Sequence, residues 1–552
     1  MTSAFLGLKV FTKKNGSILY QFFIVWSSFM KNFFHSKYNI VLLIFSLVFF
    51  VLYNYLNFSV PGIFNSPDET ANFVFTQTIA KEHKLSYRLP NDYGALNEFI
   101  HPRSTFVEEV GGDEILPVGF WGMPALYGIV AKSIGTKLVV FLTSILAIFG
   151  VWAFYGIIKK IFSEQISFWS SVLLFFQPVL WYYTGRSMFH NVGFVSLVLM
   201  GVWLLISKPI KKYIWSNDIL GMVIFMLGIL MRPNEIVWIV LCICIVVIMY
   251  RKEISFSRLL TWVIIGLLFV GLYGWINIQV YGSSAGSYIS SRSLEVRHWY
   301  SFIFPFGIDI EMILKSGWFY FVKMFWWFSI PALFGFCLFI FEWIKKRLTK
   351  EQIVFGIVFI LASLFLFVYY GSNHDTLFDQ KTIGVAYTRY WLPLFVASTI
   401  FVVFAYFWLL ERISYKRFLN ILGIISVIIS FVYSAKVVYG GIDGLDNTKD
   451  NLLYAYEVKT WVLANTKEDV IIITDHEDKF FWPERQVIVR FFDSRVGEAV
   501  QKLAQERKIV YYFCPRLDDV QRENVYIHLR RFGLGMGKIM DFQEHELYII
   551  RQ

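Results

Sequence analysis

The chain contains 552 residues, of which 57% are hydrophobic, 20% are aromatic and only 16% carry a charge. Because an average soluble protein has about 25% charged residues, this composition excludes a soluble globular enzyme and a disordered chain. The 51 lysines and arginines exceed the 40 acidic residues and leave a formal net charge of +11. Such an excess occurs in nucleic-acid-binding proteins and in the cytoplasmic loops of membrane proteins. The positions of the charges distinguish the two classes.

Apolar segments of membrane-spanning length recur from residue 39 to residue 438. A spanning helix needs about 20 mostly apolar residues, because each residue adds about 1.5 Å across a core about 30 Å thick. The segment 218–250 is long enough for two passes if Arg232-Pro233-Asn234-Glu235 breaks it, since a proline and two charges disfavour a continuous span. Apolar length therefore predicts about eleven spans. Apart from the broken segment, they are residues 39–57, 138–158, 166–183, 189–206, 259–280, 317–343, 352–370, 390–410 and 419–438.

Basic residues fall in every second connection between these spans. They lie before the first span and at Lys159-Lys160, Lys208 to Lys212, Arg251-Lys252, Lys345 to Arg347 and Arg412 to Arg417. Because lysine and arginine in short loops favour the cytoplasmic side, the pattern predicts a multi-pass protein of the cell membrane with a cytoplasmic N-terminus. The C-terminal region then lies outside the cytoplasm, and the net charge reflects topology rather than binding to nucleic acid. The aromatic-rich residues 18–34 are candidates for an interfacial helix.

Two segments lack span-length apolar runs. Residues 58–136 form a long outer segment between the first two spans, and residues 443–552 form a more highly charged tail. The alternation of strand and helix patterns in the tail predicts an α/β domain with a largely parallel sheet. We therefore expect a transmembrane domain over residues 1–442 and an extracytoplasmic α/β domain over residues 443–552. The tail strands are expected at 470–474, 486–490, 509–513 and 547–550, with helices at 452–466 and 496–507.

The most informative stretch begins at Ser66-Pro67-Asp68-Glu69, directly after the first span. Ser-x-x-Glu is a capping box, proline suits the first helical position, and acids in the first turn complement the helix dipole. Those features give the stretch a purely structural explanation. Two adjacent carboxylates at the outer interface also suit a general base and a group that orients the acceptor. The local sequence leaves both explanations open.

The order of a short cytoplasmic segment, one span and Pro67-Asp68-Glu69 opening a helix in a long outer loop resembles the GT-C glycosyltransferases. Within that class, the chain is similar to the protein O-mannosyltransferase and lipid A aminoarabinose transferase family. Three further motifs carry this resemblance, which covers residues 50–440. They are Phe120-Trp-Gly-Met-Pro-Ala-Leu-Tyr-Gly128, which resembles the juxtamembrane helix, Arg232-Pro233, which resembles a basic-proline break, and Tyr387-Thr-Arg-Tyr-Trp-Leu-Pro393, which resembles the start of a late span.

The resemblance implies a membrane transferase that takes a mannose-like hexose or a related sugar from a polyprenyl-phosphate donor. It passes the sugar, with inversion, to an extracytoplasmic protein, lipid or glycan acceptor. Asp68 is then the catalytic base that deprotonates the acceptor hydroxyl. Glu69 orients Asp68, holds the acceptor or binds a metal, and the sequence leaves these roles open.

The departing phosphate calls for cations near the outer interface, and arginine grips a phosphate bidentately. The candidate donor-phosphate ligands are Arg389, Arg232, Arg103, Tyr390 and Lys381, and the further candidates for contacts with donor or acceptor are His101, Arg186 and His190. A divalent cation, Mg²⁺ or Mn²⁺, stays open, with Asp309 and Glu311 as candidates for its ligands. The charged run Asp475 to Lys479 in the tail favours loop solvation and helix capping over a metal or acidic site.

Two other classes of function compete with the transferase. A transporter or flippase of lipid-linked sugars would hold the headgroup with the arginines during passage, and it predicts paired repeats and midplane charges. The sequence shows no repeat. A signalling receptor whose outer tail binds ligand would not need about eleven spans. Within the transferases, the chain lacks the Trp-Trp-Asp-Tyr-Gly motif of oligosaccharyltransferases, and it has Thr388-Arg389-Tyr390 in place of the Lys-Leu-Pro of the aminoarabinose transferases.

Overall fold

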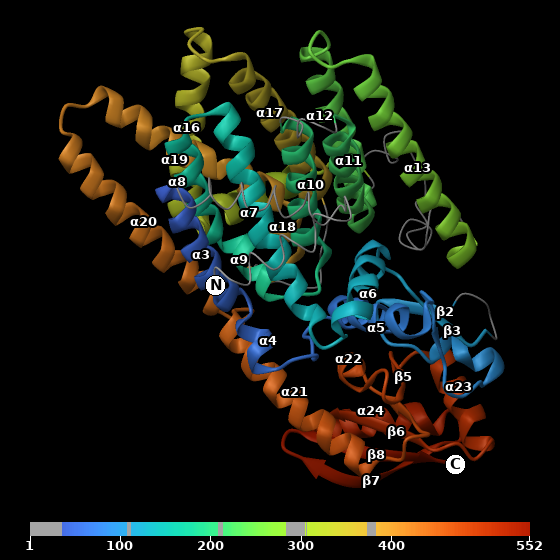
Figure 1. Cartoon of the computed structure of the whole chain (residues 1–552). Coiled ribbons are helices and arrows are strands. Elements are labelled where there is room, and N and C mark those ends of the chain that lie inside the picture. The colour runs from blue at the N-terminus through green and yellow to red at the C-terminus, as the bar shows by residue number, and fades with distance from the viewer. Residues whose placement is uncertain (1–35, 108–111, 208–213, 283–303, 305, 373–381) are drawn as a thin grey trace, which may run out of the picture. The chain divides into compact units, whose positions relative to one another are not determined.

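The computed structural model describes residues 36–107, 112–207, 214–282, 304, 306–372 and 382–552 (Figure 1). The chain divides into two compact units, Met1–Val51 and Leu52–Gln552. In the first unit, the described residues are Ser36 and most of α3 (Lys37–Tyr53), an apolar helix at the first predicted span. The predicted interfacial helix at 18–34 lies outside the described residues. The second unit contains the other helices, two sheets and the acidic motif.

Helices occupy the predicted spans of the second unit. Within the described ranges, six helices are long and apolar enough to cross a membrane, and two bent pairs raise the number to as many as eight. The chain is therefore consistent with a multi-pass membrane protein, while the number of about eleven spans stays a prediction. In chain order the helices are η2 (Val139–Phe141), α7 (Leu142–Ile161), α8 (Glu164–Phe175), α9 (Pro178–Gly185), α10 (His190–Ile206), α11 (Ile214–Met231), η3 (Pro233–Glu235), α12 (Ile236–Met249), α13 (Phe256–Tyr281), α15 (Ile310–Gly317), the π-helical η5 (Trp318–Met324), α16 (Trp326–Ile344), α17 (Lys350–Gly371), α18 (Ala386–Tyr390), α19 (Leu392–Arg412) and α20 (Lys416–Tyr439).

Two sharp bends interrupt these helices. The α11 and α12 helices meet at 112° at Arg232-Pro233, which confirms the predicted break. A second bend of 117° separates α9 from α10. The single span predicted at 166–183 is instead divided between α8 and α9, because Pro178 begins a new helix that Gln177 caps by accepting a hydrogen bond from the Leu180 N–H (2.8 Å).

The segment between α4 (Tyr55–Ser59) and η2 is folded rather than extended. It contains α5 (Pro67–Glu82), β1 (Tyr87–Arg88), η1 (Gly94–Phe99), β2 (Thr105–Val107), β3 (Glu114–Pro117) and α6 (Gly122–Ile134), and its antiparallel strands lie in the order β1-β3-β2. The α5 and α6 helices pack against each other. A Cβ atom at Gly128 would lie only 2.6 Å from the Ile79 side chain, so glycine permits this close approach.

The tail has a five-stranded mixed sheet in the order β5-β4-β6-β8-β7. Strands β5, β4 and β6 are parallel, whereas β8 pairs antiparallel with both β6 and β7. The prediction of a largely parallel sheet is therefore wrong, because a C-terminal hairpin completes the sheet. The β7 strand escaped prediction, since most of its side chains are exposed at the sheet edge. The elements are α21 (Leu445–Asn465), β4 (Ile471–Ile473), α22 (Asp478–Phe481), β5 (Gln486–Ile488), α23 (Ser494–Gln505), β6 (Val510–Pro515), α24 (Asp519–Arg530), which was also not predicted, β7 (Gly535–Phe542) and β8 (His545–Arg551).

The tail and the 58–136 segment share one hydrophobic core. Val74 and Phe75 of α5 belong to the same buried cluster as the strands of the five-stranded sheet. The Phe75 ring lies 6.0 Å from the Trp482 ring, and the Tyr87 ring lies 5.3 Å from the same indole. Burial of these aromatic rings contributes substantially to the free energy of folding. It fixes α5, the helix that begins with the acidic motif, against the tail.

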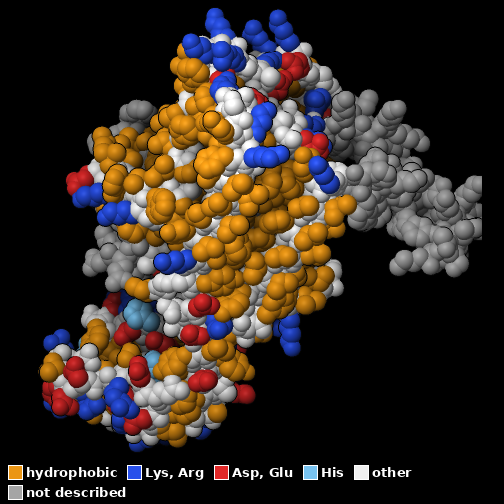
Figure 2. Space-filling view, turned by 90° about the vertical axis from the view of Figure 1, so that its left-hand side faces the viewer, with side chains coloured by type: hydrophobic (Ala, Val, Ile, Leu, Met, Phe, Trp, Pro, Cys, Tyr) orange, Lys and Arg blue, Asp and Glu red, His pale blue; other side chains and the backbone are white. Residues whose placement is uncertain are grey.

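Exposed hydrophobic side chains distinguish the helical part from the tail. Figure 2 shows a broad hydrophobic surface over the helices and a mixture of hydrophobic and charged side chains over the tail. Along α20, Ile421, Ile424 and Ile428 are each more than half exposed. In water such a surface would be unfavourable, and it is the surface expected of helices that face lipid.

The shared core yields a test of how firmly α5 is held. We expect Phe75→Ala to destabilise the protein by about 3–5 kcal/mol, because it leaves a cavity beside Trp482. Tyr456→Ala, on an α21 side chain that is 55% exposed, is the matched control with little effect. Denaturation in detergent measures the free energy of unfolding of the two purified variants. Equal destabilisation would contradict the shared core.

Candidate active site

The acidic motif forms the first turn of α5. Ser66 is the N-cap, and its Oγ accepts a hydrogen bond from the Asp68 N–H (3.3 Å). In return, Glu69 Oε2 accepts a hydrogen bond from the Ser66 N–H (3.2 Å). The predicted capping box is confirmed. It also sets the directions of the two acids, because consecutive residues point about 100° apart around a helix.

Glu69 points into the protein and is paired with Arg186. Both side chains are less than one-tenth exposed, and Arg186 donates from Nη2 to Glu69 Oε2 (2.5 Å) and from Nε to both carboxylate oxygens (3.1 and 3.2 Å). Burial raises the pKa of the Glu69 carboxyl, and the guanidinium opposes that shift. With two carboxylate oxygens occupied in this way, Glu69 supports the site instead of meeting a substrate.

Arg186 lies in the bend between α9 and α10, and neighbouring aromatic side chains also contact it. Its Nη1 donates to the Tyr182 hydroxyl (3.0 Å), and its guanidinium lies 5.3 Å from the centre of the Phe189 ring. Nearby, the Asn72 side chain of α5 donates to the Met188 carbonyl (2.8 Å). The start of α5 is thus joined to this bend by a buried ion pair and a hydrogen bond.

Asp68 points the other way and stays accessible. Its side chain is 47% exposed. The Ser104 hydroxyl donates to Asp68 Oδ1 (2.6 Å), and Arg389 Nη2 lies 3.7 Å from Oδ2. Since 3.7 Å exceeds hydrogen-bond length, Oδ2 keeps its capacity to accept a proton or a hydrogen bond. Ser104 carried no sequence signal of its own.

Arg389 has unused hydrogen-bonding capacity. Its guanidinium lies 4.6 Å from the centre of the Phe189 ring and 5.3 Å from that of Tyr390. Its Nε is buried and makes no hydrogen bond with any described residue. The backbone is fixed by Asn191, which donates to the Arg389 carbonyl (3.0 Å). A buried donor without a partner is costly, and an anionic ligand would satisfy it.

Arg232, by contrast, donates hydrogen bonds from two of its three guanidinium nitrogens. Its Nε donates to Glu235 Oε1 (2.9 Å), its Nη2 donates to the Tyr370 hydroxyl (2.9 Å), and that hydroxyl donates to Glu235 Oε1 (2.6 Å). The Tyr390 ring lies 5.1 Å from the Arg232 guanidinium and stacks on Tyr370 at 4.4 Å. Arg232 therefore adds positive potential behind Tyr390. Its partner Glu235 was visible in the sequence only as part of the helix break.

His190, the first residue of α10, joins the same group. Its Nε2 lies 2.9 Å from the Phe120 carbonyl, and it interacts electrostatically with Asp68, Arg232 and Arg389. The structure thus brings together predicted residues from α5, the α9–α10 bend, the α11–α12 break and α18. These are Asp68, Glu69, Arg186, His190, Arg232, Arg389 and Tyr390.

Two of the predicted residues lie in the loop that carries Ser104, but their side chains are not part of this group. Arg103 binds Asp478 of the tail through Nη2 (2.7 Å) and Nε (3.0 Å). The prediction that Arg103 binds the donor phosphate is corrected on this ground, because its guanidinium is committed to a buried carboxylate. His101 lies in the same loop, where its Nδ1 is 2.9 Å from the Pro102 carbonyl. Burial lowers the pKa of His101, so a neutral ring packs in the loop.

The candidate metal ligands do not join the acidic pair. Asp309 caps α15 by accepting from the Met312 N–H (2.9 Å), and the exposed Glu311 pairs with Lys315 (2.5 Å). Over the described ranges, no group of three or more His, Cys, Asp or Glu side chains is placed to hold a metal ion. Asp309 and Glu311 are therefore corrected to a helix cap and a surface ion pair. Lys381 lies outside the described residues.

The fold of the chain is also found in solved structures of ArnT and of an archaeal oligosaccharyltransferase. No model of a protein family matches the sequence, and no curated protein matches it. Among solved structures, the chain is similar to apo ArnT from Cupriavidus metallidurans, with 11% identity, a TM-score of 0.55 and coverage of 93% of this chain and 98% of ArnT.

The Archaeoglobus fulgidus oligosaccharyltransferase is also similar. Its form tethered to an acceptor peptide matches with 11% identity and a TM-score of 0.53, covering 88% of this chain and 70% of that enzyme. Its complex with an inhibitory peptide and a dolichol-phosphate matches with 10% identity and a TM-score of 0.51, covering 88% and 70%. At this level of identity the likenesses establish the fold.

The Glu69–Arg186 pair yields a stability prediction. Glu69→Gln leaves a buried guanidinium without its counter-charge, and breaking such a pair typically costs about 3–5 kcal/mol. Glu311→Gln, which breaks the exposed pair with Lys315, is expected to cost less than about 1 kcal/mol. Thermal denaturation in detergent compares the two variants, and a Glu69→Gln variant as stable as Glu311→Gln would contradict the assigned role of the pair.

Proposed function

We propose that the protein is a glycosyltransferase that moves a mannose-like hexose or related sugar from a polyprenyl-phosphate donor to an extracytoplasmic protein, lipid or glycan acceptor. The single observation that carries the proposal is the juxtaposition of Asp68 and Arg389. A half-exposed carboxylate with a free oxygen lies 3.7 Å from a guanidinium whose Nε has no described partner. A base for an acceptor hydroxyl and a cation for a leaving phosphate are the two groups that such a transfer needs.

The reaction follows from this pair. Asp68 Oδ2 takes the proton of the acceptor hydroxyl while the hydroxyl oxygen forms a bond to the anomeric carbon. The bond between that carbon and the phosphate oxygen breaks, and its electron pair leaves with the polyprenyl phosphate. Attack opposite the leaving group inverts the anomeric centre. Arg389 receives the developing phosphate charge through charge-assisted hydrogen bonds, and Arg232 adds positive potential at that position.

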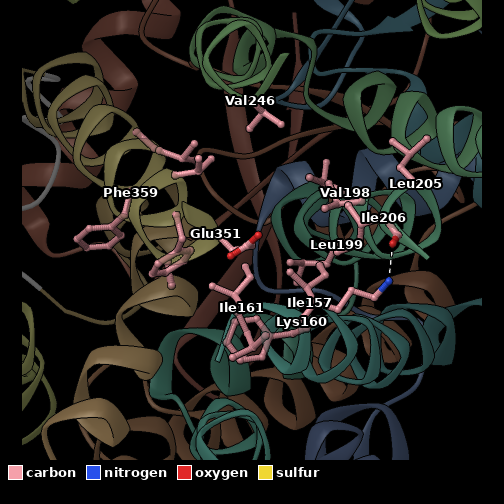
Figure 3. A pocket seen from close by; sticks show the side chains of 18 of the residues that line it. Ile157, Lys160, Ile161, Val198, Leu199, Leu205, Ile206, Val246, Glu351 and Phe359 are labelled. Atoms are coloured by element: carbon pink, nitrogen blue, oxygen red, sulfur yellow. Dashed lines mark hydrogen bonds between the residues drawn. The ribbon is translucent and has the colours of Figure 1, made fainter. Parts of the chain in front are cut away.

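An apolar cavity supports a lipid-linked donor. It has a volume of about 880 Å³ and is lined by residues of α7, α10, α12, α17 and α19 (Figure 3). Its lining includes Pro393, four residues beyond Arg389, and Trp238, whose indole donates to the Arg232 partner Glu235 (2.6 Å). Along α10 it extends from Phe194 to Ile206, or about 18 Å at 1.5 Å per residue. Such a space suits an isoprenoid chain whose phosphate is held at Arg389.

The base is tested by replacing its carboxylate. We expect Asp68→Asn to lower the turnover of an undecaprenyl-phosphate hexose in proteoliposomes roughly 10²- to 10⁴-fold, the range attributed to a general base. Release of undecaprenyl phosphate is measured against a panel of such donors. Glu82→Gln, on an exposed acid at the other end of α5, is the matched control and should keep its activity.

Full activity of Asp68→Asn would refute the proposal. If the variant moved labelled donor across the vesicle membrane as well as the unaltered protein did, while neither released undecaprenyl phosphate, the flippase alternative would replace it.

The phosphate site is tested separately by binding. We expect Arg389→Gln to weaken binding of undecaprenyl phosphate by about 1.5–3 kcal/mol, because it removes charged hydrogen bonds to the ligand. Arg389→Lys should recover only part of the affinity, since an ammonium cannot bind bidentately or stack on Phe189 in the same way. Arg412→Gln, at the opposite end of α19, is the control. Equal affinities for Arg389→Gln and Arg412→Gln would remove Arg389 from the phosphate site.

A further inference from the structure

A buried carboxylate of the tail holds the loop next to Asp68. Asp478 begins the short helix α22, and its side chain has no solvent exposure. Its Oδ2 accepts the Arg103 backbone N–H (2.8 Å), and its Oδ1 accepts Nε (3.0 Å) and Nη2 (2.7 Å) of the same residue. The His476 carbonyl accepts a further bond from Nη2 (2.7 Å). Both the backbone and the side chain of Arg103 are therefore fixed by the tail.

The residue after Arg103 is the one that touches Asp68. Ser104 has a φ of 63°, a left-handed conformation that disfavours residues other than glycine, asparagine and aspartate. The surrounding contacts must therefore impose it. Its carbonyl accepts from the Val118 N–H (3.1 Å), and its hydroxyl donates to Asp68 Oδ1 (2.6 Å). In this conformation the hydroxyl is directed at one oxygen of Asp68, and the other oxygen stays free.

The tail reaches Asp68 by a second route. Trp482, directly after α22, packs on Phe75 in the helix that begins with Asp68. The α22 segment thus contacts the helix that carries the acid and binds the loop that carries its hydrogen-bond donor. Two independent contacts with one tail element set the position of one carboxylate.

We infer that the tail is a positioning module for the base, in which Asp478 acts through Arg103 and Ser104 to hold Oδ1 of Asp68 and present Oδ2 to the acceptor hydroxyl. The inference rests on the proposed function, because it assigns Asp68 as the base. Asp478 touches no reacting group in this scheme. Its effect is on geometry, and small displacements of a catalytic group are costly to turnover.

The test compares two buried acids of the tail in the full chain. Asp478→Asn removes the charge that binds Arg103. Glu546→Gln is the matched control, because Glu546 is also buried but its partners Lys538 and Tyr548 (both 2.6 Å) lie within the tail. Turnover of an undecaprenyl-phosphate hexose in proteoliposomes is normalised to the number of sites that bind undecaprenyl phosphate. This normalisation removes losses caused by unfolded protein.

We expect Asp478→Asn to lower kcat roughly 10- to 100-fold, as a misplaced base would, with the KM for the donor changed less than about twofold. Glu546→Gln should keep its kcat per binding site. Equal losses of kcat in the two variants, or an unchanged kcat in Asp478→Asn, would overturn the inference.

A second variant probes the last link in the chain of contacts. Ser104→Gly removes the hydroxyl at a position whose φ suits glycine, so it tests the hydrogen bond without adding strain. We expect it to lower kcat as Asp478→Asn does, and the double variant to be no slower than the slower single variant, since both changes act on the same bond. A double variant whose loss of kcat equals the product of the two single losses would overturn the inference.

Failure of the inference is distinguishable from failure of the proposed function. Asp68→Asn with full activity would remove the base itself, whatever the tail variants do. Binding of undecaprenyl phosphate should be unchanged by Asp478→Asn and Ser104→Gly, because neither residue lies at Arg389. If Asp478→Asn does not fold, Ser104→Gly alone decides the inference.

Discussion

The buried ion pair between Glu69 and Arg186 is the constraint on which the site depends. Leaving either charge alone in this environment would cost several kcal/mol, so the first turn of α5 and the bend between α9 and α10 have to meet. Once Glu69 is turned inward to Arg186, the helical geometry turns Asp68 outward. The pair also explains why two adjacent acids have different exposures, 47% for Asp68 and 2% for Glu69. One acid anchors the helix, and the other is available for chemistry.

The arginines near the site differ in whether a buried carboxylate pairs with them. Arg186 has Glu69, Arg232 has Glu235 and Arg103 has Asp478, and each of these carboxylates is buried. Arg389 differs, because its nearest acid is 3.7 Å away and half exposed. Stacking on Phe189 orients its guanidinium without consuming its hydrogen bonds. A ligand with a phosphate therefore meets a free donor at Arg389, and the neighbouring Arg232 raises the positive potential there.

Much of the helical architecture could be predicted from sequence, because spans, breaks and caps are local. Apolar runs located the helices, Pro233 located one bend, and Ser66 to Glu69 gave the capping box that the structure contains. The convergence of Asp68 with Arg389 was expected only from the resemblance to a family. The division of 166–183 at Pro178 was missed, since one proline in an apolar run does not by itself show that a helix ends there.

The pairings that build the site could not be predicted from local pattern. Glu69 and Arg186 are 117 residues apart, and Arg103 and Asp478 are 375 apart. No periodicity links such partners, so the sequence did not show which of the candidate arginines are paired with a buried carboxylate. The role of Ser104 could not be predicted either, because it depends on a backbone conformation that contacts with the tail impose. The antiparallel hairpin of β7 and β8 was missed because an exposed edge strand lacks the apolar alternation of an inner one.

The central claim is that a phosphate binds at Arg389 beside a free Asp68 carboxylate oxygen. A structure of the full chain with undecaprenyl phosphate tests it most directly. The account predicts the phosphate within hydrogen-bond distance of Arg389, with the isoprenoid chain in the apolar cavity. A phosphate bound instead at the opposite end of that cavity, beside Lys160 and Arg258, would contradict it.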